Sequence, residues 1–267
     1  MKKQLVLPVL LILLTAIFAG SCSKEYSASG FTKVTPEEDS FNLAINFIPM
    51  ADTLKLRLDS ACRNFWNEEY TVSAFKFYVS KVDLINTDSN RTYHVNSDKY
   101  FLVDAADSTT WTVKLLASPF TYNRISFLIG IDSARNISGT QTGALDPAKG
   151  MFWTLSSGYV MAKLEGKSAL SSQPNNKIEY HIGGFSGENS VLRKPTLLFP
   201  FGQYLQITTT PGRKSFINVK ADVNAWFSNP HQVKIKNTPA CTSPGLMAKD
   251  ISENYSKMFS VTGVINN

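Results

Sequence analysis

The chain of 267 residues is poor in the side chains on which many enzymes and metal sites depend. It has three histidines and three cysteines, and it contains neither a Cys-x-x-Cys nor a His-Glu-x-x-His motif. A glycine-rich phosphate loop and a Gly-x-Ser-x-Gly nucleophile motif are missing as well. These absences argue against the enzyme classes that carry such motifs, and they leave few candidates for acid–base catalysis by imidazole.

A strong charge of one sign is also absent. The chain has 27 basic and 21 acidic residues, a formal net charge of +6, and its basic residues are spread along the sequence. No cluster of lysine and arginine interleaved with aromatic residues occurs, so nucleic acid is not an expected partner. Hydrophobic residues make up 43% of the chain, which is enough for a substantial core.

The longest apolar run stands at the N-terminus. Lys2 and Lys3 precede an apolar stretch over residues 5–14, and small residues then lead to Cys22. This order is typical of a secretion signal, and the run is shorter than the roughly 20 residues that span a bilayer. Residues 19–22 (AGSC) resemble a lipobox, although Ala19 stands where leucine is usual, which predicts lipidation of Cys22. The alternative is an ordinary cleaved signal with an incidental cysteine.

The rest of the chain is expected to form a tether and one domain. Residues 23–39 are polar and aperiodic, which favours a tether that holds the domain away from the lipid. Residues 40–267 show no internal repeat and no change of composition, so one domain is the simplest interpretation. In an oxidising compartment Cys62 and Cys241 could form a disulfide; the alternative is two unpaired thiols.

Alternation of apolar and polar residues predicts a mainly β protein. Leu43, Ile45 and Phe47 recur at period two, which is the pattern of a half-buried strand. The same pattern predicts further strands around residues 54–58, 75–80, 100–103, 121–131, 158–164, 178–182, 204–209 and 216–223. Turn-forming clusters separate these runs, so we predict an antiparallel β-sandwich.

One segment near the C-terminus departs from this pattern. Ser243 and Pro244 have the character of a helix start, and apolar or amide side chains then recur at helical spacing. The recurring residues are Met247, Ile251, Asn254 and Met258. A short C-terminal helix is therefore expected.

An ordered series of motifs runs through the predicted domain. They are YVS (78–80), GID (130–132), GMFWTLSSGY (150–159), KLEG (163–166), YHIG (180–183) and NYSKMF (254–259). The series resembles the MbnP-like family of copper-binding proteins, the relatives of the methanobactin-associated MbnP, from about residue 41 to residue 259. The chain departs from the family pattern at Leu155, which replaces the second tryptophan of Trp-x-Trp and leaves Trp153 alone.

The resemblance implies an exported β-sandwich protein associated with copper handling. In members studied as copper proteins, a partner related to di-haem cytochrome c peroxidases oxidises a tryptophan to kynurenine. The resemblance therefore implies such a partner, with Trp153 as the residue that remains to be modified. If the family modifies the second tryptophan of Trp-x-Trp, this chain cannot form kynurenine there, because Leu155 stands at that position.

The three histidines are the candidate copper ligands, because imidazole binds copper well. His181 lies in a predicted strand, His94 in a polar hairpin region, and His231 in a turn after Asn229 and Pro230. No two of them are spaced i, i+2 or i, i+4, so the fold must assemble any site. The alternative is a hydrogen-bonded structural role for His181 and an ordinary exposed position for the other two.

Other side chains are candidates of a weaker kind. Trp153, Met151 and Tyr159 could line a metal site, with core packing as the alternative. A second set consists of hard oxygen donors near loops that could hold calcium, with solvated or capping carboxylates as the alternative. This set is Asp132, Asp146 and Glu165.

These observations leave three functions open. The first is a copper-binding lipoprotein of the cell envelope, anchored in the outer membrane and facing the periplasm or the cell surface, which stores, scavenges or relays copper without a reaction of its own. The second is a non-catalytic interaction module that keeps the fold and has lost metal binding, as Leu155 and the shortage of histidine suggest. A glycan-cleaving enzyme would need two facing carboxylates, and the sequence nominates no such pair.

Overall fold

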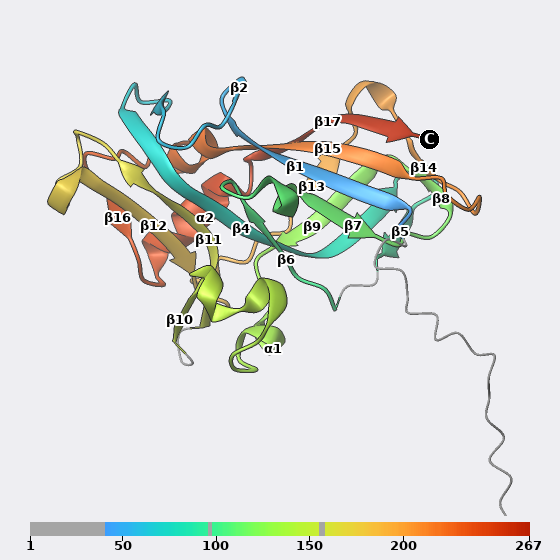
Figure 1. Cartoon of the computed structure of the whole chain (residues 1–267), viewed down its shortest axis with the longest axis horizontal. Coiled ribbons are helices and arrows are strands. Elements are labelled where there is room, and N and C mark those ends of the chain that lie inside the picture. Colours follow the sequence, from blue (N-terminus) through green and yellow to red (C-terminus); the bar gives the residue numbers. More distant parts are fainter. Residues whose placement is uncertain (1–40, 96–97, 155–157) are drawn as a thin grey trace, which may run out of the picture. The chain divides into compact units, whose positions relative to one another are not determined.

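Two β-sheets lie face to face and enclose an aromatic core (Figure 1). This computed structural model describes residues 41–95, 98–154 and 158–267, all within the unit Asp39–Asn267. The predicted fold class is confirmed, because the structure is mainly β with a sandwich-like arrangement and a short helix near the C-terminus. Cys22, the tether over 23–39 and Leu155 lie outside the described residues.

The smaller sheet combines strands from both ends of the domain. Its order is β17-β15-β1-β2, and β7 pairs with β1. The bounds are β1 Leu43–Ala51, β2 Leu54–Lys55, β7 Thr112–Leu115, β15 Ser215–Asp222 and β17 Phe259–Asn266. Strands β1 and β15 run parallel, whereas β15 and β17 run antiparallel. The first and last long strands of the domain therefore lie on either side of β15.

The larger sheet is built around β4 (Glu69–Asn86). Its order is β13-β9-β4-β11-β12-β16; β3, β5 and β6 pair with β4, and β10 pairs with β11. Their bounds are β3 Ala61–Arg63, β5 Arg91–His94, β6 Phe101–Asp104, β9 Arg124–Ile129, β10 Phe152–Thr154, β11 Gly158–Lys167, β12 Lys177–Gly183, β13 Thr196–Leu198 and β16 Ala240–Cys241. A separate pair consists of β8 (Phe120–Tyr122) and β14 (Leu205–Ile207).

Aromatic side chains join the two sheets. Phe47 of β1 meets Phe77 of β4 and Phe127 of β9 edge to face, with ring centroids 5.8 and 5.3 Å apart. Phe259 of β17 completes the group at 5.0 Å from Phe127. All four rings are buried. Edge-to-face aromatic pairs add roughly 0.5–1.5 kcal/mol each to the burial of their apolar area, so this cluster fixes how the sheets pack.

The helices are short and lie in the connections. They are α1 Ser133–Asn136, α2 Leu246–Tyr255, η1 Ser108–Trp111, η2 Gly143–Leu145, η3 Pro147–Lys149, η4 Pro174–Asn176, η5 Pro200–Gly202 and η6 Val223–Phe227. Helix α2 is the predicted C-terminal helix, but Gly245 precedes it rather than a Ser243 cap. In the part of the chain that the structure describes, no helix has the length and apolarity needed to cross a membrane.

Cys62 and Cys241 lie on different strands of the larger sheet and are free thiols. Cys62 is on β3 and Cys241 on β16, and β4, β11 and β12 lie between these strands. Four inter-strand spacings amount to about 19 Å, whereas a disulfide needs Cα atoms less than about 7 Å apart. The disulfide that the sequence allowed is therefore not formed.

Thiol counting tests this arrangement. Unfolding the protein without reductant should expose two thiols in Cys62 and Cys241, measured by reaction with a maleimide and intact mass. In the folded protein Cys241 should react more slowly, because it is buried whereas Cys62 is half-buried. Recovery of no reactive thiol after unfolding would show that the two residues pair.

Candidate functional site

His181 lies on the outer face of the larger sheet. It stands on β12 opposite Lys163 of β11, and its Nε2 atom is 2.6 Å from Oε1 of Glu165. The same Glu165 oxygen is 3.3 Å from Nζ of Lys163. Among the described residues, His181 and Glu165 do not belong to a group of three potential metal donors, and the ammonium group of Lys163 repels a cation from this oxygen. The observed role of His181 is therefore a hydrogen-bonded cross-strand contact.

The carboxyl group of Glu165 gives this contact a measurable pH dependence. The hydrogen bond from His181, helped by the charge of Lys163, lowers the pKa of Glu165 from 4.5 to about 2. Because the folded pKa is depressed, the contribution to stability is present above pH 4.5 and is lost as the pH falls toward 2.

Glu165→Gln is thus expected to lower the free energy of unfolding by about 1 kcal/mol at pH 7, since the group is partly exposed, and by less at pH 3. Urea unfolding of the parent and the variant at both pH values measures this. When His181 is also replaced by alanine, the effect of Glu165→Gln on the free energy of unfolding should differ less between pH 7 and pH 3. If that difference stays the same, a partner other than His181 causes it.

The aromatic and thioether candidates near this face belong mainly to the core. Met151 and Tyr159 are buried, and the Tyr159 hydroxyl donates to the carbonyl of Leu145 at 2.8 Å. Trp153 is half-buried with its ring against Gly183, where an added Cβ would lie 2.4 Å from a ring carbon. Gly183 and His181 share one face of β12 because they are two residues apart. Trp153 is thus the aromatic candidate beside His181.

His94 and the remaining calcium candidates are each engaged separately. Oδ1 of Asp83 lies 2.7 Å from Nδ1 of His94, and Oδ2 of Asp83 accepts a hydrogen bond from Nζ of Lys194 at 2.6 Å. Asp132 caps α1 and bonds the Tyr100 hydroxyl, and Asp146 caps η3. Among the described residues, Asp132, Asp146 and Glu165 do not form a group with ligand atoms close enough to share one ion.

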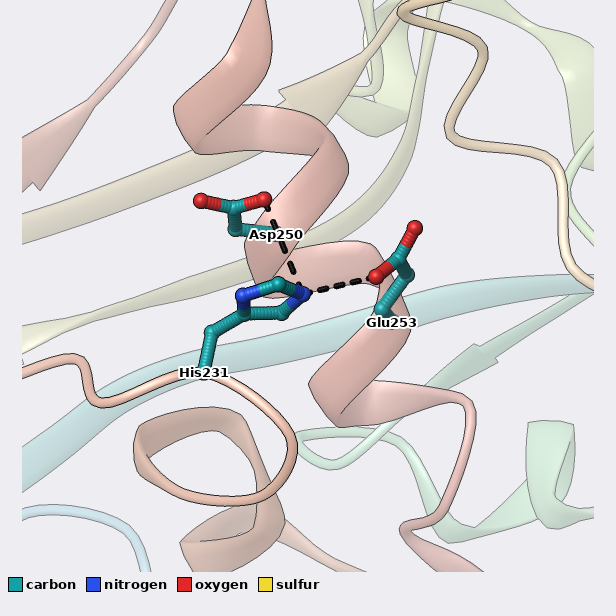
Figure 2. A group of neighbouring side chains, drawn as sticks. All are labelled: His231, Asp250 and Glu253. Carbon is teal, nitrogen blue, oxygen red and sulfur yellow. Dashed lines mark hydrogen bonds and ion pairs between the residues drawn. The ribbon is translucent and has the colours of Figure 1, made fainter.

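His231 lies in the one group of three potential metal donors found among the described residues (Figure 2). Its Nε2 atom is 2.6 Å from Oε2 of Glu253 and 3.6 Å from Oδ1 of Asp250. All three ligand atoms lie within 4.8 Å of one another. The side chains are 34–36% exposed, so an ion has access to them from solvent.

The fold holds these side chains from two directions. Asp250 and Glu253 are three residues apart on α2, so they lie on the same helix face. Asn254, which is buried, fixes the loop that carries His231. Its Oδ1 accepts from the backbone N–H of His231, and its Nδ2 donates to the carbonyls of Trp226 and His231. The imidazole is thereby positioned over the helix before any ion binds.

Hydrogen bonding and charge favour the ionised form of Glu253. The hydrogen bond from His231, with the charges of Arg193 and Lys249, lowers the pKa of Glu253 below its ordinary value. Arg193 also lies 3.4 Å from Oε1 of Glu253, the oxygen that faces away from His231. One Glu253 oxygen is thus held by arginine and the other is directed at the imidazole.

The group can exchange a proton for a cation. A carboxylate only accepts hydrogen bonds, so Nε2 of His231 carries the proton in its contact with Glu253. A metal at Nε2 replaces this proton, and the donors must move apart by a few tenths of an ångström to about 3 Å for bonds of about 2 Å. Because only an imidazole nitrogen without a proton binds a metal, binding moves this proton to Nδ1 or to solvent and breaks the contact with Glu253.

The sequence nominates His231 as a metal ligand but not its two partners. Asp250 and Glu253 lie 19 and 22 residues further along the chain, on a helix predicted from its start signal and its recurring apolar and amide side chains. Their i, i+3 spacing was the available signal, but nothing in the sequence placed the His231 loop over that face.

Comparison with known proteins adds the family. The model of the MbnP family matches residues 40–243, which include His181 and His231 and end before Asp250. A solved structure of MbnP from Methylosinus trichosporium is 12% identical, with a TM-score of 0.49 over 84% of this chain and 97% of that chain. A search of curated proteins found no match. Since the family model covers most of the domain and five of the six ordered motifs, the chain belongs to the MbnP family.

Proposed function

We propose that this chain is an exported, lipid-anchored MbnP-family protein that binds one copper ion at His231, Asp250 and Glu253. The observation that carries the proposal is the convergence of one imidazole nitrogen and two carboxylate oxygens within 4.8 Å, at a position open to solvent. The role is storage, scavenging or relay of the metal, with no reaction of its own.

The donor set favours Cu(II) over Cu(I). Imidazole and carboxylate are nitrogen and oxygen donors that suit Cu(II), whereas Cu(I) is selected by thiolate and thioether groups. The Irving–Williams order also places Cu(II) above the other divalent ions for a given site of this kind. Cobalt, nickel and zinc should therefore bind at the same place with lower affinity.

Metal titration tests the proposal. The chain from Ser23 onward, at micromolar concentration, should take up one equivalent of Cu(II), with a ligand-field band and proton release on binding. Zn²⁺ should compete and Ca²⁺ should not. Absence of stoichiometric Cu(II) binding would remove the proposed function.

Anchoring and modification form a separate part of the proposal. Lipidation at Cys22 would place the domain in the cell envelope, on the periplasmic or outer face of the outer membrane. A di-haem cytochrome c peroxidase-like partner is proposed to act on Trp153, whose half-buried ring lies on Gly183 beside His181. Intact mass of the protein from its native host reports acylation and kynurenine together.

A second candidate is an interaction module that has lost metal binding. Its support is that all three histidines already contact carboxylates, and that Arg193 also engages Glu253. Under this reading the His231 group is a surface ion pair that ties a loop to α2. Copper titration separates the two candidates, because the module predicts no uptake.

A further inference from the structure

A cleft of about 440 Å³ opens between the β4–β5 hairpin and the segment that leads into β8. Residues 90–93 form one wall, and residues 118–120 with Tyr122 form the other. Its volume lies within the range of small-molecule sites, which is roughly 300–1,000 Å³. None of the lining residues belongs to the His231 group. The cleft is therefore separate from the proposed copper site.

Buried amide side chains fix the two walls of the cleft against each other. Asn86, at the end of β4, donates from Nδ2 to the carbonyl of Thr121 at 2.8 Å, and its Oδ1 accepts from the backbone N–H of Ser89 at 2.9 Å. Asn123 accepts from the backbone N–H of Thr87 through Oδ1 and donates to its hydroxyl through Nδ2. Both asparagines are buried. The cleft is thus preformed, and a ligand does not have to order its walls.

Three aromatic rings supply the apolar surface of the cleft. Phe120 and Tyr122 stand two residues apart on β8, with their ring centroids 5.7 Å apart, and Tyr93 comes from β5. The hydroxyl of Tyr122 donates to the carbonyl of Ser118 at 2.9 Å, which holds this buried ring in place. Aromatic walls of this kind favour a ligand that has a flat ring of its own.

The guanidinium of Arg91 gives the cleft its charge. It lies over the ring of Phe120, 5.2 Å from the ring centroid, and this stacking orients it. Within the described chain, no hydrogen bond or ion pair engages its N–H groups. None of the described lining residues is acidic, and Asp88 in the adjacent turn accepts from the Tyr204 hydroxyl at 2.5 Å. An oriented guanidinium with available donors is a bidentate partner for a carboxylate or a phosphate.

We propose that this cleft binds a small organic anion that carries a carboxylate or a phosphate on a flat apolar ring. The anionic group meets Arg91, and the ring of the ligand packs among Tyr93, Phe120 and Tyr122. A neutral ligand of the same shape leaves the guanidinium unpaired, and a small anion without a ring leaves the aromatic walls uncovered. The site goes beyond copper binding, and it does not depend on the His231 group.

Titration with four probes tests the site. The chain from Ser23 onward is used, because residues Asp39–Asn267 form one unit with its own core. In the ¹⁵N-labelled protein, 2-naphthoate should move the amide resonances of residues 90–93 and 120–122, with a dissociation constant of about 1 mM or below. The neutral 2-naphthamide and the ringless acetate should each bind at least about fivefold more weakly. Tighter binding of 2-naphthyl phosphate than of 2-naphthoate would support the site with a phosphate ester as its ligand.

Arg91→Met should weaken the binding of 2-naphthoate about tenfold and leave that of 2-naphthamide unchanged, because only the guanidinium contact is lost. Arg135→Met is the matched control, since Arg135 also lies over an aromatic ring, 5.5 Å from the centroid of Tyr100, outside this cleft. This control should bind 2-naphthoate like the parent. No saturable binding of 2-naphthoate, equal affinities for the acid and the amide, or equal affinities of the parent and Arg91→Met would each overturn the proposal. Copper titration of the same protein decides the metal site independently.

Discussion

Replacing His231 by alanine should lower the affinity of the protein for Cu(II) by about 100-fold or more. The substitution removes the only imidazole of the proposed centre, and two carboxylates on one partly exposed helix face bind copper weakly by themselves. The backbone N–H of His231 still reaches Asn254 in the variant, so the loop should keep its position. Competition against a chelator of known affinity, followed at the ligand-field band, measures the change.

The other two histidines supply matched controls. His94 and His181 also contact carboxylates, at 2.7 and 2.6 Å, so their alanine variants remove equivalent histidine–carboxylate contacts elsewhere. Both should bind Cu(II) like the parent. Glu253→Gln should weaken binding at least tenfold while keeping the shape of the side chain. If His181→Ala abolished binding and His231→Ala did not, the centre would lie on the sheet face beside Trp153.

Replacing Gly166 by alanine should prevent stable folding. A Cβ at this position would lie 1.8 Å from the carbonyl oxygen of Thr71 in β4, an overlap with backbone that no rotamer relieves. Gly166 stands on β11 where the pairing register with β4 shifts, at the centre of the larger sheet. The loss should exceed about 4 kcal/mol, a large part of the 5–15 kcal/mol of a typical domain.

Gly263→Ala is the matched comparison on β17. Nothing lies within 4 Å of a Cβ built there, and the residue lies in a strand of the smaller sheet. This variant should unfold within about 0.5 kcal/mol of the parent. Soluble yield and urea unfolding followed by far-ultraviolet circular dichroism compare the pair. A Gly166→Ala variant as stable as Gly263→Ala would show that β4 and β11 approach less closely than described.

Period-two patterning predicted the strands that have one buried face. The predicted strands over 158–164 and 178–182 correspond to β11 and β12. Strand β11 continues three residues further, and β12 is one residue longer at each end. The run over 54–58 was overestimated: only Leu54 and Lys55 pair, and Leu54 is exposed. Alternation reports the composition of a strand, but it does not report whether a neighbour is present to complete the hydrogen bonds.

Strand β17 and the donor group were not predicted, for a related reason. The alternation in 259–266 is weakened by Gly263, and its partner β15 lies more than 35 residues earlier. The carboxylates of the His231 group are likewise brought to their imidazole by tertiary contacts, chiefly those of buried Asn254. The sequence nominated the three histidines as separate residues, and the register of β11 with β12 and the docking of α2 decided their partners.

The position of β15 between β1 and β17 also affects the order of events during synthesis. One neighbour of β15 is formed from the first residues of the domain and the other from the last, so the smaller sheet lacks an outer strand until residues 259–266 emerge. Pairings between such distant segments close slowly. In a nascent chain with this topology the smaller sheet stays incomplete until residues 259–266 have been synthesised, which would suit the export proposed above.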